Sequence, residues 1–123
     1  MSGQYQFIEA LSFTASLSEY FFNDEEYSNL QSGISEQPDK GTVIPGAAPI
    51  RKLRWADKRR GMGRRGGLRV IYVHLPDLQI VVMLAVYDKD ESSDLAKDEK
   101  KILQAEAKEM IEDLRAKHSR TRQ

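Results

Sequence analysis

The chain has 123 residues, of which 40% are hydrophobic and 31% charged, and its 19 Lys and Arg balance its 19 Asp and Glu. This composition excludes an intrinsically disordered chain and predicts one globular domain over residues 1–123, with a frayed basic tail at 117–123. Cysteine is absent, which excludes disulfides, cysteine metal sites and a thiol nucleophile. We recognise no secretory signal, and the apolar run at 80–86 is far shorter than a membrane span, so we expect a cytoplasmic protein without a membrane partner.

The neutral average conceals a basic segment at residues 50–72. That segment holds nine Lys or Arg and one acid, Asp57, so its net charge is +8 and the remainder of the chain carries −8. A strongly cationic segment in an acidic body favours a polyanionic partner, and nucleic acid is the partner we expect.

The first half of the chain predicts one strand and two short helices. The segment YQFIEAL, from Tyr5, alternates polar and apolar residues as a strand does. Apolar residues at helical spacing predict a helix over 13–22. A second helix is predicted from Asp24, with acids in its first turn, and ends at Pro38. Residues 38–49, rich in Pro, Gly and Ala, predict a loop.

The second half predicts three strands and a final helix. The strands are expected at 50–56, 68–75 and 79–87. The last of these is apolar on both faces, which places it at the sheet centre. An apolar stripe from Ile102 to Leu114 predicts the helix. The order β-α-α-β-β-β-α therefore predicts an α+β fold with a mostly antiparallel sheet and helices packed on one face.

The strand positions of the basic segment are the candidate site. Alternation along a strand places Lys52 and Arg54 on the same face. If the strand that contains Arg69 pairs beside them, three cations converge. Fixed guanidinium groups bind phosphate with paired hydrogen bonds and stabilise negative charge in a transition state. A solvated surface loop is the alternative, but charges on strand positions argue against it.

Other motifs carry less chemistry. The GxGxxG match at 61–66 lacks the surrounding strand and helix of a dinucleotide site, so we reject that interpretation. His74 lies in a predicted strand, where we expect a structural role. No His, Asp and Glu cluster has metal-ligand spacing, and we expect neither a metal nor a cofactor.

Several blocks together resemble the RelE/HigB family of toxins from type II bacterial toxin–antitoxin systems, in its HigB-type branch. The most specific blocks are VIPG at 43–46 before the basic KLRW strand, RGGLRVIY at 65–72, and YDKDESSDL at 87–95. The resemblance extends over about residues 5–115 and implies a RelE-like fold.

What the resemblance implies is a ribosome-dependent mRNA endonuclease. Such a toxin cleaves mRNA in the ribosomal A site by metal-independent attack of the 2′-OH on the adjacent phosphate, which inhibits translation. The resemblance also implies a cognate antitoxin, commonly a helix-turn-helix DNA-binding protein, which silences the toxin. The toxin would then associate with operator DNA only as a complex with that antitoxin.

Roles for individual residues follow from the same motifs. The resemblance implies that Arg69 holds the scissile phosphate and that Tyr87 orients or stacks on a base. The catalytic candidates are Lys52, Arg54, Arg69, Tyr87 and Lys89. The candidates for contact with mRNA or rRNA are Arg51, Lys58, Arg59, Arg60, Arg64 and Arg65. Asp88 and Asp90 depart from the less acidic surroundings expected for Lys89.

Two alternatives stay open. One is a non-enzymatic, ParE-like toxin or nucleic-acid-binding module on the same fold, because fold does not determine function. The other is a degraded toxin or a purely structural binding module, for which the acids beside Lys89 are the only hint in the sequence.

Overall fold

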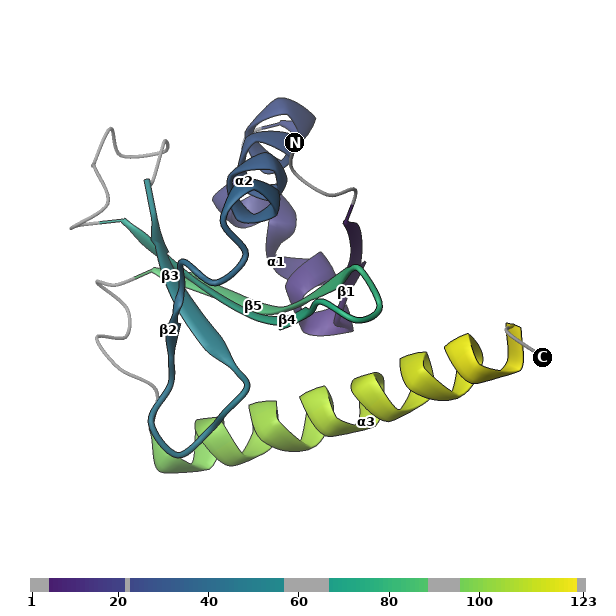
Figure 1. Ribbon diagram of the computed structural model, residues 1–123. Helices are drawn as coiled ribbons and strands as arrows, with labels where there is room; N and C mark the ends of the chain where they lie inside the picture. Colours follow the sequence, from purple (N-terminus) through teal and green to yellow (C-terminus); the bar gives the residue numbers. More distant parts are fainter. Residues whose placement is uncertain (1–4, 22, 57–66, 89–95, 122–123) are drawn as a thin grey trace.

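The computed structural model describes residues 5–21, 23–56, 67–88 and 96–121. In chain order the elements are β1 (Gln6–Glu9), α1 (Leu11–Tyr20), α2 (Asp24–Glu36), β2 (Thr42–Val43), β3 (Arg51–Trp55), β4 (Leu68–Leu75), β5 (Ile80–Asp88) and α3 (Lys97–Thr121) (Figure 1). The predicted α+β class and the order of the predicted elements are confirmed. The short strand β2 is an addition, because it lies within the stretch predicted as a loop.

The strands form one five-stranded sheet in the order β1-β5-β4-β3-β2. β1 runs parallel to β5, and the other pairs are antiparallel. β4 therefore occupies the centre. The prediction that β5 is the central strand is wrong, because β5 lies between β1 and β4, one place from the edge of the sheet.

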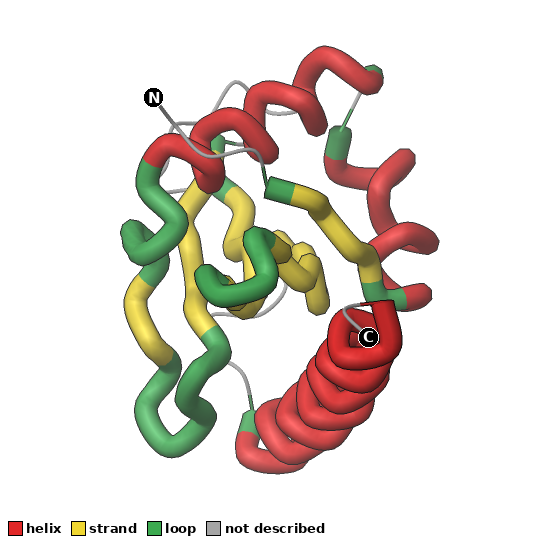
Figure 2. The backbone as a smooth tube through the Cα atoms, turned by 45° about the vertical axis from the view of Figure 1, so that its right-hand side comes forward, coloured by secondary structure: helices red, strands yellow, loops and turns green. Residues whose placement is uncertain are grey.

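The helices cover both faces of the sheet, which corrects the prediction that they pack on one face. α1 and α2 lie against the face to which Val70 and Tyr72 of β4 belong, and α3 lies against the face of Ile71 and Val73. Figure 2 shows the strands between α3, which ends at the C-terminus, and the helices above. The physical reason is that β4 and β5 are apolar at successive positions, so each face carries side chains that must be removed from water.

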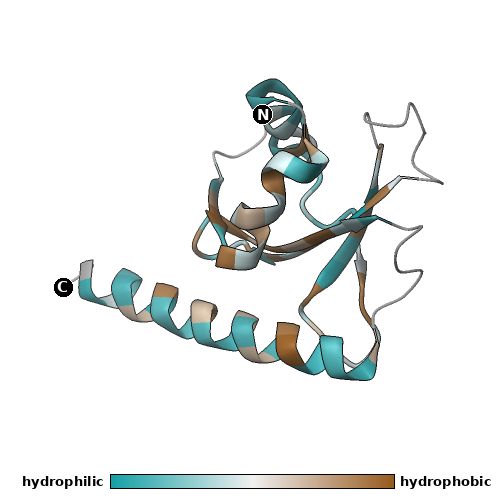
Figure 3. Ribbon diagram, turned by 180° about the vertical axis from the view of Figure 1, so that it is seen from behind, coloured by the Kyte–Doolittle hydropathy of each residue, from teal (hydrophilic) through white to brown (hydrophobic). Residues whose placement is uncertain are grey.

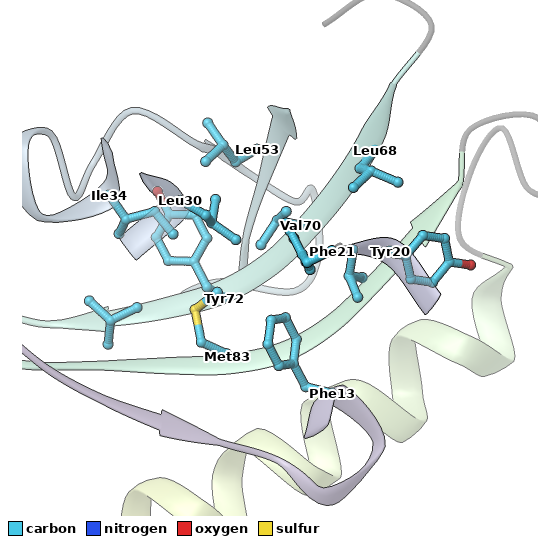
Figure 4. Close-up of a cluster of buried hydrophobic side chains, with 12 residues drawn as sticks. Phe13, Tyr20, Phe21, Leu30, Ile34, Leu53, Leu68, Val70, Tyr72 and Met83 are labelled. Atoms are coloured by element: carbon cyan, nitrogen blue, oxygen red, sulfur yellow. The ribbon is translucent and has the colours of Figure 1, made fainter. Parts of the chain in front are cut away.

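The larger aromatic core lies under α1 and α2. Figure 4 shows Leu30 and Ile34 beside the ring of Tyr72, with Met83 from β5 close by and Phe13 next to Met83. All five side chains are almost fully buried. Burial of each such side chain contributes about 1.5–3 kcal/mol, so this cluster holds the helical hairpin on the sheet.

α3 continues to Thr121, which corrects the prediction of a frayed tail for residues 117–121. Basic residues in its last turn, His118 and Arg120, favour this continuation because cations stabilise the negative end of a helix dipole. Figure 3 shows α3 as mostly hydrophilic with scattered apolar positions. No helix in the described part of the chain is both long enough and apolar enough to cross a bilayer.

Polar contacts fasten α3 to the rest of the molecule. Nε2 of Gln104 donates a 2.9 Å hydrogen bond to the carbonyl oxygen of Gly46, ahead of β3. Arg115 forms an ion pair with Asp77 in the β4–β5 turn, and this pair lowers the pKa of the Asp77 carboxyl. The helix is thus tied to the sheet at two separate places along its length.

Tyr72 joins the sheet to the segment between α2 and β2. Its hydroxyl donates a hydrogen bond of 2.7 Å to the carbonyl oxygen of Pro38 and accepts one of 3.0 Å from the backbone N–H of Gly41. A Cβ atom on Gly41 would lie 2.8 Å from that hydroxyl, so only glycine permits this close approach. Burial raises the pKa of Tyr72, which keeps the phenol protonated and able to donate.

Tyr72→Phe should lower the free energy of unfolding by about 1–3 kcal/mol, because it leaves the buried N–H of Gly41 without its acceptor. Tyr5→Phe is the matched control, since the Tyr5 hydroxyl bonds to His74 in a more exposed setting and its removal should cost less than about 1 kcal/mol. Urea denaturation followed by circular dichroism measures both. Equal losses in the two variants would contradict the proposed importance of the Tyr72 contacts.

Candidate functional site: a row of basic side chains

Three of the predicted catalytic residues occupy one row across the sheet. Arg54 of β3 is the register partner of Arg69 in β4, and Arg69 is the partner of Tyr87 in β5. Directly opposed residues of antiparallel strands project from the same face. Arg54, Arg69 and Tyr87 therefore form a line on the face that α3 covers, which we call the basic row.

Lys52 extends this arrangement by one position. It lies two residues before Arg54 on β3 and is the register partner of Ile71 in β4 and of Thr42 in β2. The predicted common face of Lys52 and Arg54 is confirmed, because Ile71 belongs to the cluster on the α3 side. Residues two apart in a strand are about 7 Å apart, so Lys52 lies beside the basic row rather than in it.

Exposure differs sharply along the row. Arg54, on β3, is exposed, whereas Arg69 at the centre is only 5% exposed and donates from Nη1 to the carbonyl oxygen of Leu68 at 3.3 Å. Lys52 and Tyr87 are half-buried. A ligand that approaches from solvent would meet Arg54 first, while Arg69 adds positive charge beneath it.

Asp88 does not belong to this row. It is fully buried at the end of β5 and is the register partner of Leu68, whose side chain belongs to the cluster on the α1–α2 side. Strand alternation therefore places its carboxylate on the face opposite to Tyr87. The acidic departure noted in the sequence is thus separated from the basic row at this position.

Arg51, a predicted RNA contact, lies apart from the other basic residues. Its register partner is Tyr72, so it projects from the α2 face of the sheet. Nη1 donates to the carbonyl oxygens of Asp39 at 3.0 Å and Gly41 at 2.7 Å, and Nη2 lies 3.3 Å from the Asp39 carboxylate. These contacts hold the segment before β2 against the sheet.

The remaining predicted site residues lie outside the described residues. They are Lys58, Arg59, Arg60, Arg64 and Arg65, which precede β4, and Lys89, which follows β5.

A second polar group, absent from the sequence predictions, lies on the α2 face. Nδ1 of His74 lies 2.9 Å from Oδ1 of Asp39, and its Nε2 lies 3.0 Å from the Tyr5 hydroxyl. The expected structural role of His74 is confirmed, because these bonds and that of Arg51 join β1, β4 and β3 to the segment before β2. No local sequence pattern could reveal this group, because His74 is 35 residues from Asp39 and 69 residues from Tyr5 in the chain.

No family model matches the chain. In the part of the chain that the structure describes, no group of three or more His, Asp and Glu side chains could hold a metal ion.

The contacts of Asp39 should make the free energy of unfolding decrease at acid pH. The hydrogen bond with His74, followed by the charge of Arg51, holds the pKa of the Asp39 carboxyl below its ordinary value. A pKa that is lower in the folded chain gives stability that is complete above the ordinary pKa, about 4, and is lost as the pH falls through the folded value. Asp39→Asn should thus be less stable than the wild type at pH 6, and this difference should shrink toward pH 2.

Urea midpoints measured between pH 6 and pH 2 test this expectation. Asp77→Asn serves as a comparison, because contact with Arg115 lowers the pKa of Asp77 in the same direction. A wild type and an Asp39→Asn variant whose midpoints stay parallel over the whole range would contradict the assigned contacts.

Proposed function

We propose that the chain is an endoribonuclease that cleaves mRNA on the ribosome without a metal ion. The observation that carries the proposal is the basic row, in which Arg54, Arg69 and Tyr87 are held on three adjacent strands with Lys52 beside them. Hydrogen-bonded strands restrict these side chains far more than a loop would, and preorganised charge is what phosphate chemistry requires.

The proposed reaction is an in-line transesterification. The 2′-OH oxygen forms a bond to the adjacent phosphorus, the bond from phosphorus to the 5′-oxygen breaks, and the 2′-OH proton leaves to a base. A proton delivered to the leaving oxygen gives a 5′-OH, and the other product is a 2′,3′-cyclic phosphate. Negative charge grows on the phosphorane-like state, so cations placed around it lower the barrier.

The exposure of each basic residue suggests its role in the proposed reaction. Arg54 is exposed and can bind the scissile phosphate directly, whereas the nearly buried Arg69 stabilises charge from beneath and positions the row. Tyr87 has a hydroxyl and Lys52 an ammonium group, which makes them the candidates for proton transfer and base orientation. Lys89 is a further basic candidate from the resemblance.

The resemblance to RelE/HigB toxins supports the biological setting of the proposal. It favours entry into the ribosomal A site, a cognate helix-turn-helix antitoxin and a cytoplasmic location, where ribosomes and mRNA are found. The basic residues between β3 and β4 would then contact rRNA or mRNA.

The experiment is cleavage of a defined mRNA in a translating extract, with 5′ ends mapped by primer extension. Arg54→Ala should reduce the cleavage rate by about a hundred-fold or more, as removal of a transition-state donor does in other enzymes. Arg54 is exposed, so this variant should fold, and Arg69→Lys tests the buried position without deleting its charge. Arg120→Ala, on exposed α3 surface, is the matched control and should cleave at the wild-type rate.

Absence of cleavage by the wild type, with or without ribosomes, would overturn the proposal. Cleavage by Arg54→Ala at the wild-type rate would overturn the assigned role of the basic row.

The burial of Arg69 favours one second candidate, a non-enzymatic ParE-like toxin or nucleic-acid-binding module. If Arg69 only supports the sheet, the exposed cations could bind a polyanion without cutting it. Expression that arrests growth with DNA damage, while translation continues, would favour this candidate over the nuclease.

A further inference from the structure

A polar pocket of about 310 Å³ lies at the edge of β3, next to the basic row. β2 pairs with Arg51 and Lys52, and the pocket lies beyond that pairing. Its lining comes from three consecutive residues of β3 and from the end of α2 with the segment that follows. The lining residues are Gly33, Glu36, Gln37, Lys40, Leu53, Arg54 and Trp55.

Trp55 gives the pocket an aromatic wall. It is half-buried, with part of its side chain packed against the aromatic core. A Cβ atom on Gly33 would lie 2.9 Å from Cη2 of the indole, so glycine at this position lets α2 approach the ring closely. The ring is therefore held by the helix, and a held aromatic surface can stack on a flat ligand with little loss of conformational freedom.

Two kinds of polar group surround this ring. Lys40 supplies positive charge, while Glu36 supplies a carboxylate and Gln37 an amide at the C-terminal end of α2. The last turn of a helix carries partial negative charge on its carbonyl groups. The negative groups at the end of α2 would repel an anion that has no hydrogen-bond donors. A flat ligand with N–H donors and an attached phosphate can bind both these negative groups and the positive charge.

The segment that carries Gln37 and Lys40 is held in place. Tyr72 bonds to Pro38 and Gly41, and Arg51 bonds to Asp39 and Gly41, so both sides of Lys40 are anchored to the sheet. The backbone N–H of Lys40 also donates to the carbonyl oxygen of Gln37 at 3.0 Å. The backbone on this side of the pocket is thus held by contacts that the basic row does not use.

Arg54 lies between the pocket and the basic row, since it lines the pocket at the edge of β3 while strand alternation places its side chain on the face of the basic row. A nucleotide whose base entered the pocket would place its phosphate near Lys40, and the next phosphate of the chain would reach Arg54 around the edge of β3. We infer that this pocket is a subsite for one base of single-stranded RNA, stacked on Trp55, and that it favours guanine. Guanine presents adjacent N1–H and N2–H donors that a carboxylate such as Glu36 can accept, whereas uracil presents one N–H between two carbonyl acceptors. The identity of the ligand as RNA rests on the proposed function.

The chain contains one tryptophan, so fluorescence excited at wavelengths where its tyrosines absorb little reports on this pocket. The experiment titrates the full chain with 5′-GMP, 5′-UMP and inorganic phosphate, without ribosomes, and measures Trp55 emission. GMP should quench or shift the emission, UMP should bind about ten-fold more weakly, and phosphate alone should leave it unchanged. A short RNA with one guanine should reproduce the GMP response.

Variants locate the binding groups. Glu36→Gln should remove most of the preference for GMP over UMP, whereas Glu25→Gln, exposed in the first turn of the same helix, should leave it intact. Gly33→Ala should weaken GMP binding by about ten-fold, because its methyl group displaces the indole without removing any polar group. Circular dichroism confirms that each variant is folded.

The outcomes separate this inference from the proposed nuclease. Cleavage of mRNA together with no response of Trp55 to GMP overturns the subsite and leaves the nuclease standing. A GMP response without RNA cleavage supports the subsite and counts against the nuclease. A response to phosphate alone, or equal binding of GMP and UMP, overturns the guanine subsite.

Discussion

The burial of β4 on both faces is the constraint on which the rest of the structure depends. Seven of its eight positions are buried, and Arg69 is among them. β3 and β5 complete its hydrogen bonds, α1 and α2 cover one face, and α3 covers the other. Removal of a guanidinium group from water is costly unless its charge is compensated, and Arg69 donates a hydrogen bond to the carbonyl oxygen of Leu68.

Strand alternation gives the basic residues of β3 different tasks. Arg51 projects toward α2 and anchors the segment that precedes β2, whereas Lys52 and Arg54 belong to the face of the basic row. The basic residues of β3 therefore both stabilise the fold and contribute side chains to the candidate site. The two tasks meet at the edge of β3, where the anchored segment and Arg54 line the same pocket.

The anchored segment also shows how a residue far from the basic row can matter to it. Tyr72 lies in the aromatic core under α2, and its hydroxyl reaches the backbone on both sides of Lys40. Packing under the helical hairpin, the path of the chain into β2 and the shape of the pocket are consequently coupled. Contacts of this kind couple the stability of the fold to the shape of the pocket.

The sequence by itself determined the elements and their order. Alternation and helical spacing are local properties, so β3, β4, β5 and both long helices could be placed within a few residues. The shared face of Lys52 and Arg54 followed from alternation alone, and a convergence of these two residues with Arg69 was expected if their strands paired. The concentration of positive charge likewise needed only the sequence.

Only the tertiary structure decided how these elements combine. Apolar residues on both faces of β4 did not reveal which helix would cover which face, because periodicity contains no information on long-range contacts. The bonds of His74 and Tyr72 to the segment before β2 and the pocket at Trp55 all depend on residues distant in sequence. Burial distinguished Arg69 from Arg54, two arginines that the sequence presents as equivalent strand cations, because burial depends on neighbours that only the folded chain brings together.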